Sequence, residues 1–191
     1  MEIRLVKTEE EKEAVYRFRY QIYIEEMRFK QFYADRDRQT IREPLDEFGY
    51  IFIALQENKV VGTVRVNYAN LSDLGYYLGL FDMESVGHFH PQRTSITTKL
   101  IVSSEFRSTT LAVRLVLAAY QQAIKDRIKY DFIECKPNLV NFFLRIGYKL
   151  HKEQINHPDR GKCISMILNL EDFEHFERIG SPFLRVLVKQ N

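Results

Sequence analysis

The hydrophobic residues of the first part of the chain follow three successive patterns. Residues 2–6 predict a short strand. Apolar residues then recur three and four positions apart, so we expect a helix over Glu9–Tyr20, with Thr8 as its N-cap, that continues or resumes as far as Glu26. Residues 28–44 are highly charged and poor in aliphatic side chains, which favours a mobile loop or an irregular arm.

Strand patterns dominate the middle of the chain. Gly49–Gln56 and Lys59–Asn67 predict two strands joined by a tight hairpin. Residues 67–93 contain scattered glycines, so we expect a second long irregular stretch there. A further strand is predicted over Ser95–Val102, and the paired apolar positions of Thr109–Arg127 predict a long amphipathic helix.

The last third of the chain alternates strands and helices. Tyr130–Cys135 is a nearly continuous apolar run, which is typical of a strand covered on both faces. Pro137 opens a predicted helix that ends near Ile146, where Gly147 supplies the C-cap. Beyond it we expect a hairpin of strands 148–151 and 163–169 joined by a loop over 156–161, then a short helix over 171–179 and an apolar end.

Composition and charge narrow the class of protein. With 191 residues, of which 45% are apolar and 28% charged, the chain suits one globular domain with a sizeable core. A net charge of +2 gives no reason to expect nucleic-acid binding. There is neither a signal-peptide pattern nor an apolar run of the ~18 residues that a membrane span needs, so we expect a cytoplasmic protein. His88 and His90 lack a third ligand, and no metal is predicted.

The most informative motif is the polar turn between the strand that ends at Val102 and the long helix. It carries one arginine, Arg107, and a row of hydroxyl side chains, and it leads directly into the helix. A helix N-terminus presents backbone N–H groups and the positive end of the helix dipole, which together bind phosphate. The residues that we expect to bind an anionic cofactor here are Arg107, Ser108, Thr109, Thr110 and Leu111.

This turn resembles the pyrophosphate-binding turn of the GNAT acyltransferase superfamily, written Q/R-x-x-G-x-G/A. Arg107, Thr110 and Ala112 occupy its key positions, with Thr110 where the family has its central glycine. The stretch from Asn138 to Tyr148 is similar to the family's N-x-x-x-x-F-Y-x-x-x-G-F block. The resemblance implies the GNAT fold, in which a mixed α/β sheet of about seven strands contains a splayed pair and is flanked by helices.

The resemblance also implies one GNAT-like domain over residues 1–191 that uses an acyl-thioester donor, either acyl-CoA or the phosphopantetheine of an acyl carrier protein. In the family, the block that begins at Asn138 packs beside the thioester and the pantetheine. Phe142 and Phe143 are therefore expected to contact the substrate, and Asn138 the donor. The backbone N–H groups expected to bind the thioester carbonyl belong to Leu100, Ile101 and Val102.

The first half of the chain is similar to one branch of the superfamily, the acyl-homoserine-lactone synthases and the N-acyl amino acid synthases. Arg19 in the first helix, Asp46 after the arm and Arg65 after a G-x-x-R turn match residues that cluster around the acceptor site in that branch. The branch also has an E-x-x-R pair on the strand before the phosphate turn. Here Ile96 and Lys99 stand at those positions, which leaves the acceptor open.

The chemistry implied by the resemblance is acyl transfer from the thioester to the amine of a small acceptor, such as an amino acid. An amine is protonated at neutral pH, so a base must accept a proton before the amine attacks. The candidates for this base are Glu134 and Asp46. Glu134 could instead form a salt bridge with Lys136 or Arg145, and Asp46 could simply cap the turn that follows the arm.

Two further points concern the substrates. Lys99 and Arg65 are cations that can bind a substrate carboxylate, although Lys99 could equally be a solvated charge at a strand edge. Phe143 stands where many relatives have the tyrosine that protonates the leaving thiolate. The branch favours an acyl carrier protein as donor. Two other functions remain open, an acetyl-CoA-dependent N-acetyltransferase and a catalytically silent GNAT-like binding module.

Overall fold

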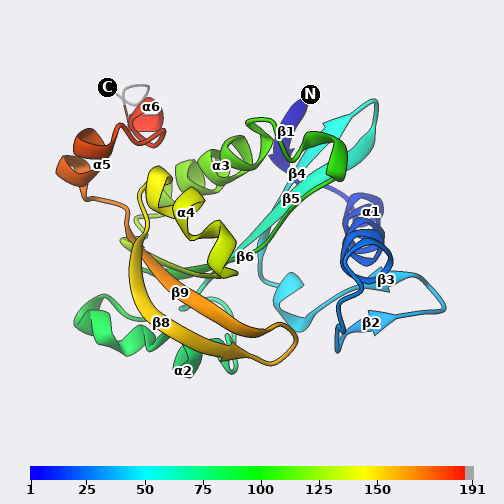
Figure 1. The fold of residues 1–191 in the computed structure, drawn as a ribbon, viewed down its shortest axis with the longest axis horizontal. Helices are drawn as coiled ribbons and strands as arrows, with labels where there is room; N and C mark the ends of the chain where they lie inside the picture. Colours follow the sequence, from blue (N-terminus) through cyan, green and yellow to red (C-terminus); the bar gives the residue numbers. More distant parts are fainter. Residues whose placement is uncertain (188–191) are drawn as a thin grey trace.

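Seven strands form a mixed sheet at the centre of the molecule (Figure 1). The structure is a computed structural model that describes residues 1–187. Across the sheet the strands are ordered β1-β4-β5-β6-β7-β9-β8, and neighbouring strands are antiparallel except for β6 and β7. The strands are β1 (Glu2–Leu5), β4 (Tyr50–Gln56), β5 (Lys59–Tyr68), β6 (Thr94–Val102), β7 (Tyr130–Cys135), β8 (Lys149–His157) and β9 (Gly161–Asn169).

The parallel pair separates along its length, which confirms the predicted splay. Among the described residues, β6 and β7 pair only where Thr94–Ile96 lies beside Tyr130–Phe132. Further along β6 there is a β-bulge, because the pairing register with β5 shifts near Lys99 and the φ of Lys99 is 55°. Beyond Ile96, the backbone of β6 has no described pairing with β7, and we call this divergence of the two strands the gap.

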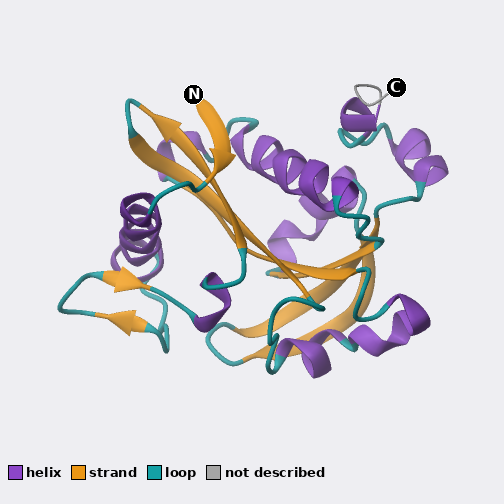
Figure 2. Ribbon diagram, turned by 180° about the vertical axis from the view of Figure 1, so that it is seen from behind, coloured by secondary structure: helices purple, strands orange, loops and turns teal. Residues whose placement is uncertain are grey.

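Two separate layers cover the faces of the sheet (Figure 2). One face packs against α3 (Leu111–Lys125) and α4 (Val140–Ile146). The other face packs against α1 (Glu9–Tyr20) and α2 (Tyr77–Phe81). We call the second face the acceptor face, because α1 carries Arg19, one of the residues predicted to lie around the acceptor. The remaining helical segments are η1 (Gln21–Glu26), η2 (Pro44–Asp46), η3 (Met83–Phe89), η4 (Ser104–Phe106), η5 (Pro137–Leu139), α5 (Phe173–Ile179) and α6 (Leu184–Leu187).

Local sequence explains where the first helix begins and how it continues. The Thr8 hydroxyl accepts a hydrogen bond from the backbone amide of Glu11 at 3.3 Å, so the predicted N-cap is confirmed. Beyond Tyr20 the chain continues as the π-helix η1, which carries it to Glu26 as predicted. No helix of residues 1–187 is long and apolar enough to cross a bilayer.

Two stretches predicted to be irregular have regular structure. Residues 28–44 contain a hairpin of β2 (Ala34–Asp35) and β3 (Thr40–Ile41) that packs against α1, with Ile41 fully buried. Residues 67–93 contain α2 and η3, because Tyr77, Phe81 and Met83 are buried in a hydrophobic core. The scattered glycines of this stretch gave no indication of that core.

The last hairpin and the chain end also differ from prediction. β8 and β9 extend to His157 and from Gly161, so the connection is a short turn where a six-residue loop was predicted. The predicted apolar end forms α6, and residues 188–191 lie outside the described residues.

Candidate active site

Five charged side chains form a buried network on the acceptor face. Nη1 of Arg19 donates to both carboxylate oxygens of Asp46, at 2.7 and 2.8 Å. Arg65, on β5, donates from Nη1 to Asp46 at 2.9 Å and from Nη2 to Glu43 at 2.8 Å. Lys99 pairs with the other oxygen of Glu43. The predicted trio of Arg19, Asp46 and Arg65 is therefore brought together, and Lys99 joins it through Glu43, a residue that the sequence analysis missed.

A short turn places the two carboxylates of this network. Glu43 and Asp46 cap the segment η2 reciprocally, and the amide of Glu43 donates to Oδ2 of Asp46 at 2.7 Å. Asp46 thus caps the turn, as one alternative predicted, and also binds two arginines. Gly49 follows the turn, and a Cβ there would lie 2.9 Å from Cγ of Arg65 and 2.9 Å from the carbonyl oxygen of Leu45. The close approach of the turn to β5 therefore requires glycine.

The network has one more positive charge than negative charge. Arg19, Arg65 and Lys99 supply three cations, whereas Asp46 and Glu43 supply two carboxylates, and all five side chains are buried. Nε and Nη2 of Arg19 are buried and have no hydrogen-bond partner among the described residues. Unpaired charge and unpaired donors are costly in a protein interior. The arrangement is suited to an anion that would compensate both.

Mutual pairing fixes the protonation of the network. Burial opposes ionisation of Glu43, but the charges of Lys99 and Arg65 outweigh it and lower the pKa of Glu43 to about 2. For Asp46 burial is likewise outweighed by Arg19 and Arg65, so its pKa is lowered. Burial lowers the pKa of Lys99 to about 8, with Glu43 acting in the opposite direction. Lys99 is 5% exposed, so the alternative of a solvated edge charge is wrong.

Glu134 lies on β7 beyond the point where β6 and β7 diverge. Its side chain is 2% exposed, and Oε1 forms an ion pair with Nη2 of Arg160 in the β8–β9 turn. Oε2 is buried without a hydrogen-bond partner among residues 1–187. Neither predicted partner pairs with Glu134, because Lys136 donates to the Arg160 carbonyl and Nε of Arg145 to the Asn141 carbonyl at 3.2 Å.

A histidine and two tyrosines line the space beside Glu134. Nε2 of His157 lies 3.9 Å from Oε1 of Glu134, 3.2 Å from the Tyr76 hydroxyl and 3.4 Å from the Tyr77 hydroxyl. Burial lowers the pKa of His157 to about 4, so its imidazole is neutral at physiological pH. Sequence reasoning missed His157 and Arg160, because β8 was predicted to end before His157.

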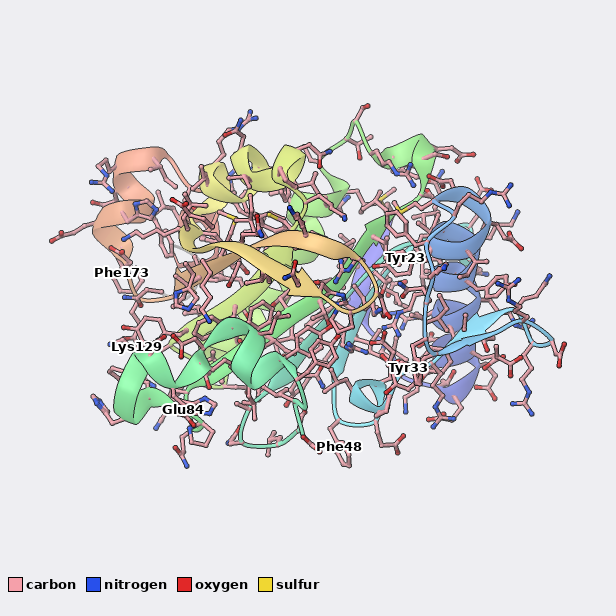
Figure 3. All side chains as sticks on the ribbon, turned by 60° about the horizontal axis from the view of Figure 1, so that its bottom comes forward. Tyr23, Tyr33, Phe48, Glu84, Lys129 and Phe173 are labelled. Atoms are coloured by element: carbon pink, nitrogen blue, oxygen red, sulfur yellow. The ribbon has the colours of Figure 1, made fainter. Side chains whose placement is uncertain are left out.

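The β8–β9 turn lies beside the N-terminal part of the chain. Figure 3 shows this hairpin in gold, with its turn directed toward the helix that carries the labelled Tyr23 and toward the arm that carries Tyr33. Consistent with this placement, the charges of Arg160 and Glu43 both act on the pKa of Lys99: Arg160 lowers it and Glu43 raises it. The pair of Glu134 and Arg160 is therefore close to the buried network.

The predicted phosphate turn lies at the N-terminus of α3. Nε of Arg107 donates to the carbonyl of Val102 at 3.1 Å, and its Nη1 pairs with Glu26 of η1. The hydroxyl of Thr109 accepts a hydrogen bond from the backbone amide of Leu111 at 3.2 Å, and Thr110 directly precedes Leu111, the first residue of α3. Ser108, Thr109 and Thr110 are exposed at this N-terminus, but the amide and the hydroxyl of Thr109 both donate to the carbonyl of Phe106, at 3.1 and 2.7 Å.

The remaining predicted residues lie around the gap between β6 and β7. Leu100 packs into the core beneath α3, whereas Ile101 packs beneath α1. Asn138 is exposed in η5, directly after β7. Phe143 is buried, and its ring contacts the rings of Tyr148 and Phe142. Phe142 is partly buried. Val102 is the last residue of β6. Among residues 1–187, no three His, Cys, Asp or Glu side chains could hold a metal ion.

Comparison with known proteins gives one family match and several structures of similar fold. The family model of the N-acyl amino acid synthase FeeM matches residues 14–169. No curated protein matches the chain significantly. Solved structures with the same fold confirm the predicted GNAT fold class. The acyl-homoserine lactone synthase LasI has a TM-score of 0.72 at 10% identity, with 94% of this chain and 95% of that chain covered.

Two more of these structures cover nearly the whole chain. MesI, a CoA-dependent acyl-homoserine lactone synthase, has a TM-score of 0.68 at 19% identity, with 94% of this chain and 95% of that chain covered. FeeM, an N-acyl amino acid synthase from uncultured soil microbes, has a TM-score of 0.68 at 15% identity, with 90% and 92% covered. At these identities the structural likeness shows the fold alone.

Proposed function

The chain belongs to the family of the N-acyl amino acid synthase FeeM, and we propose that it transfers an acyl group from a thioester to the amine of an amino acid. The observation that carries the amino acid as acceptor is the excess positive charge of the buried network. A carboxylate bound beside Arg19 and Lys99 would restore neutrality and give the unpaired Nε and Nη2 of Arg19 an acceptor. A simple amine offers neither.

Lys99 and Arg19, rather than Arg65, are the residues proposed to bind the carboxylate. All of the nitrogens of Arg65 are engaged, Nη1 with Asp46, Nη2 with Glu43 and Nε with Thr98 at 3.2 Å. Lys99 has three donors, of which Glu43 and Gln31 accept two. Arg65 and Asp46 accordingly position the cations that bind the substrate.

Glu134 is the proposed base. Both oxygens of Asp46 already accept hydrogen bonds from Arg19, whereas Oε2 of Glu134 is buried and has no hydrogen-bond partner within residues 1–187. As the amine nitrogen attacks the thioester carbonyl carbon, the C–N bond forms and the electron pair moves to the carbonyl oxygen. Glu134 accepts one proton from the acceptor ammonium before this attack; the C–S bond then breaks, and the second proton of the nitrogen leaves with the sulfur, which gives the amide and the free thiol. Backbone N–H groups of β6 along the gap would stabilise the oxyanion.

The proposed donor is an acyl carrier protein. Arg107, the basic residue of the phosphate turn, already shares its charge with Glu26. That pairing suits one phosphodiester at the N-terminus of α3 better than the several phosphates of coenzyme A.

The test is a mass-spectrometric assay of purified protein with long-chain acyl carrier protein, long-chain acyl-CoA or acetyl-CoA. Each donor is offered amino acids and, as matched controls, the amines that lack only the carboxylate. We expect a long-chain N-acyl product with an amino acid and at least tenfold less with its decarboxylated control. Acetylation alone would instead indicate an N-acetyltransferase, and donor binding without turnover would indicate a silent binding module.

A further inference from the structure

Arg160 is the charged group in contact with Glu134, and it comes from a different part of the chain. It lies in the turn between β8 and β9, and its side chain is 17% exposed while that of Glu134 is 2% exposed. Lys136, just after β7, donates its ammonium to the backbone carbonyl of Arg160 and so ties the turn to the end of β7. The turn thus places the guanidinium of Arg160 against the buried carboxylate of Glu134 on β7.

The pairing with Arg160 makes the two oxygens of Glu134 different. Oε1 is held by the guanidinium, and Oε2 has no partner among the described residues. We propose that Arg160 is a positioning residue that keeps Glu134 ionised and orients it, so that Oε2 accepts the proton of the acceptor amine. This inference rests on the proposed function, because it requires Glu134 to act as the base.

The other polar groups around Glu134 cannot replace Arg160. The amide of Asp159 donates to Nδ1 of His157, so the neutral ring carries its hydrogen on Nε2, which lies 3.4 Å from Nη2 of Arg160. That hydrogen lies near the hydroxyls of Tyr76 and Tyr77, both of which stay neutral because burial raises their pKa. None of these groups therefore carries a positive charge at neutral pH.

The charged groups of neighbouring elements are engaged elsewhere. Lys99 on β6 and Glu43 before η2 pair with each other, and the ammonium of Lys136 binds a carbonyl. Removing Arg160 would leave Glu134 buried without a contacting cation, and burial of that kind favours the protonated carboxylic acid. A protonated Glu134 cannot accept a proton from the amine.

The experiment measures kcat/KM for the amino acid acceptor against pH, in the wild type and in the variants Arg160→Gln, Arg160→Lys and Glu134→Gln. Lys162→Gln is the matched control, because it removes an exposed positive charge from the same hairpin. In R160Q we expect the acid limb to move up by about one pH unit or more, and the rate at neutral pH to fall about tenfold or more. R160K should move the limb back toward the wild-type position, and K162Q should keep the wild-type profile.

The outcomes separate this role from a structural one. A loss of rate in R160Q by the same factor at every pH, with the acid limb unmoved, would overturn the inference and leave the acyl transfer standing. Wild-type activity in E134Q would overturn it as well, because Glu134 would not be the base. If the wild type forms no N-acyl amino acid, the proposed function itself fails. Should R160Q not fold, R160M keeps the apolar stem without the charge and is held to the same criterion.

Discussion

Asp46 and Glu134 are both carboxylates of the acceptor face, and the structure predicts opposite consequences when each is neutralised. Asp46 accepts hydrogen bonds from Arg19, from Arg65 and from the amide of Glu43. In Asp46→Asn the two buried arginines lose the negative charge that they share. We expect the free energy of unfolding to fall by about 3–5 kcal/mol, the cost of breaking a buried ion pair from one side.

Glu134→Gln should cost less stability and much more activity. Its partner Arg160 is 17% exposed, so water partly solvates the guanidinium once the carboxylate is gone. We expect a loss of about 1–3 kcal/mol in unfolding free energy, less than for Asp46→Asn. Because Glu134 is the proposed base, however, its replacement should lower kcat by at least about a hundredfold.

Urea unfolding and acyl-transfer rates, both measured at pH 7, test the pair of variants together. Glu47→Gln is the control for stability, because Glu47 forms an exposed pair with Arg42 at 3.2 Å and should contribute less than about 1 kcal/mol. An Asp46→Asn variant with wild-type stability would refute the reasoning from burial and charge. A folded but inactive Asp46→Asn beside an active Glu134→Gln would make Asp46 the base.

Three further predictions concern other parts of the molecule. Arg107→Ala should weaken donor binding by about 1–3 kcal/mol, and an unchanged dissociation constant in a titration with acyl carrier protein would contradict the phosphate-turn assignment. Gly49→Ala should destabilise the fold by about 1–3 kcal/mol, because the new Cβ meets Arg65 and the Leu45 carbonyl at 2.9 Å; thermal unfolding measures the loss, and an unchanged midpoint would show that the turn can move. Burial raises the pKa of Asp131 to about 6, against hydrogen bonds that lower it. The raised pKa means that this group's contribution to stability is fully present below pH ~4 and declines as the pH rises through about 6. Over that pH range the unfolding free energy of Asp131→Asn should therefore rise relative to that of the wild type, by up to ~3 kcal/mol. A difference in urea unfolding free energy that does not vary with pH would contradict this.

The sequence was sufficient for most elements of the fold and for four of the five members of the buried network, all but Glu43. Strands, helix caps and the long helix follow local periodicity, which tertiary contacts reinforce here. Arg19, Asp46 and Arg65 are far apart along the chain, so no local pattern groups them, and the family resemblance supplied that information. Glu43 could have been found from its spacing, because an acid three residues before Asp46, with a proline between them, is a capping pattern.

Arg160 and His157 could not have been predicted in the same way. The pairing of β8 with β9 shifts register twice, between Leu150 and Lys152 and between Lys152 and Ile155. Each bulge adds residues to one strand, so counting alternate positions from the start of β8 does not fix which side chains face the sheet. Arg160 lies in the turn beyond those bulges, so its approach to Glu134 is seen only in the folded structure.

The residues that replace the E-x-x-R pair bear on the choice of acceptor. Ile96 is fully buried in an apolar cluster with Phe132, so hydrocarbon occupies the position of the acid. Lys99 takes its carboxylate partner from Glu43, and an excess of one positive charge remains. The acid that we propose as base lies instead across the gap, on β7. In this proposal, an acceptor served by both groups presents a carboxylate to the cations of the network and an amine to Glu134. An amino acid carries these two groups on one carbon, whereas an amine without a carboxylate leaves the buried charge uncompensated.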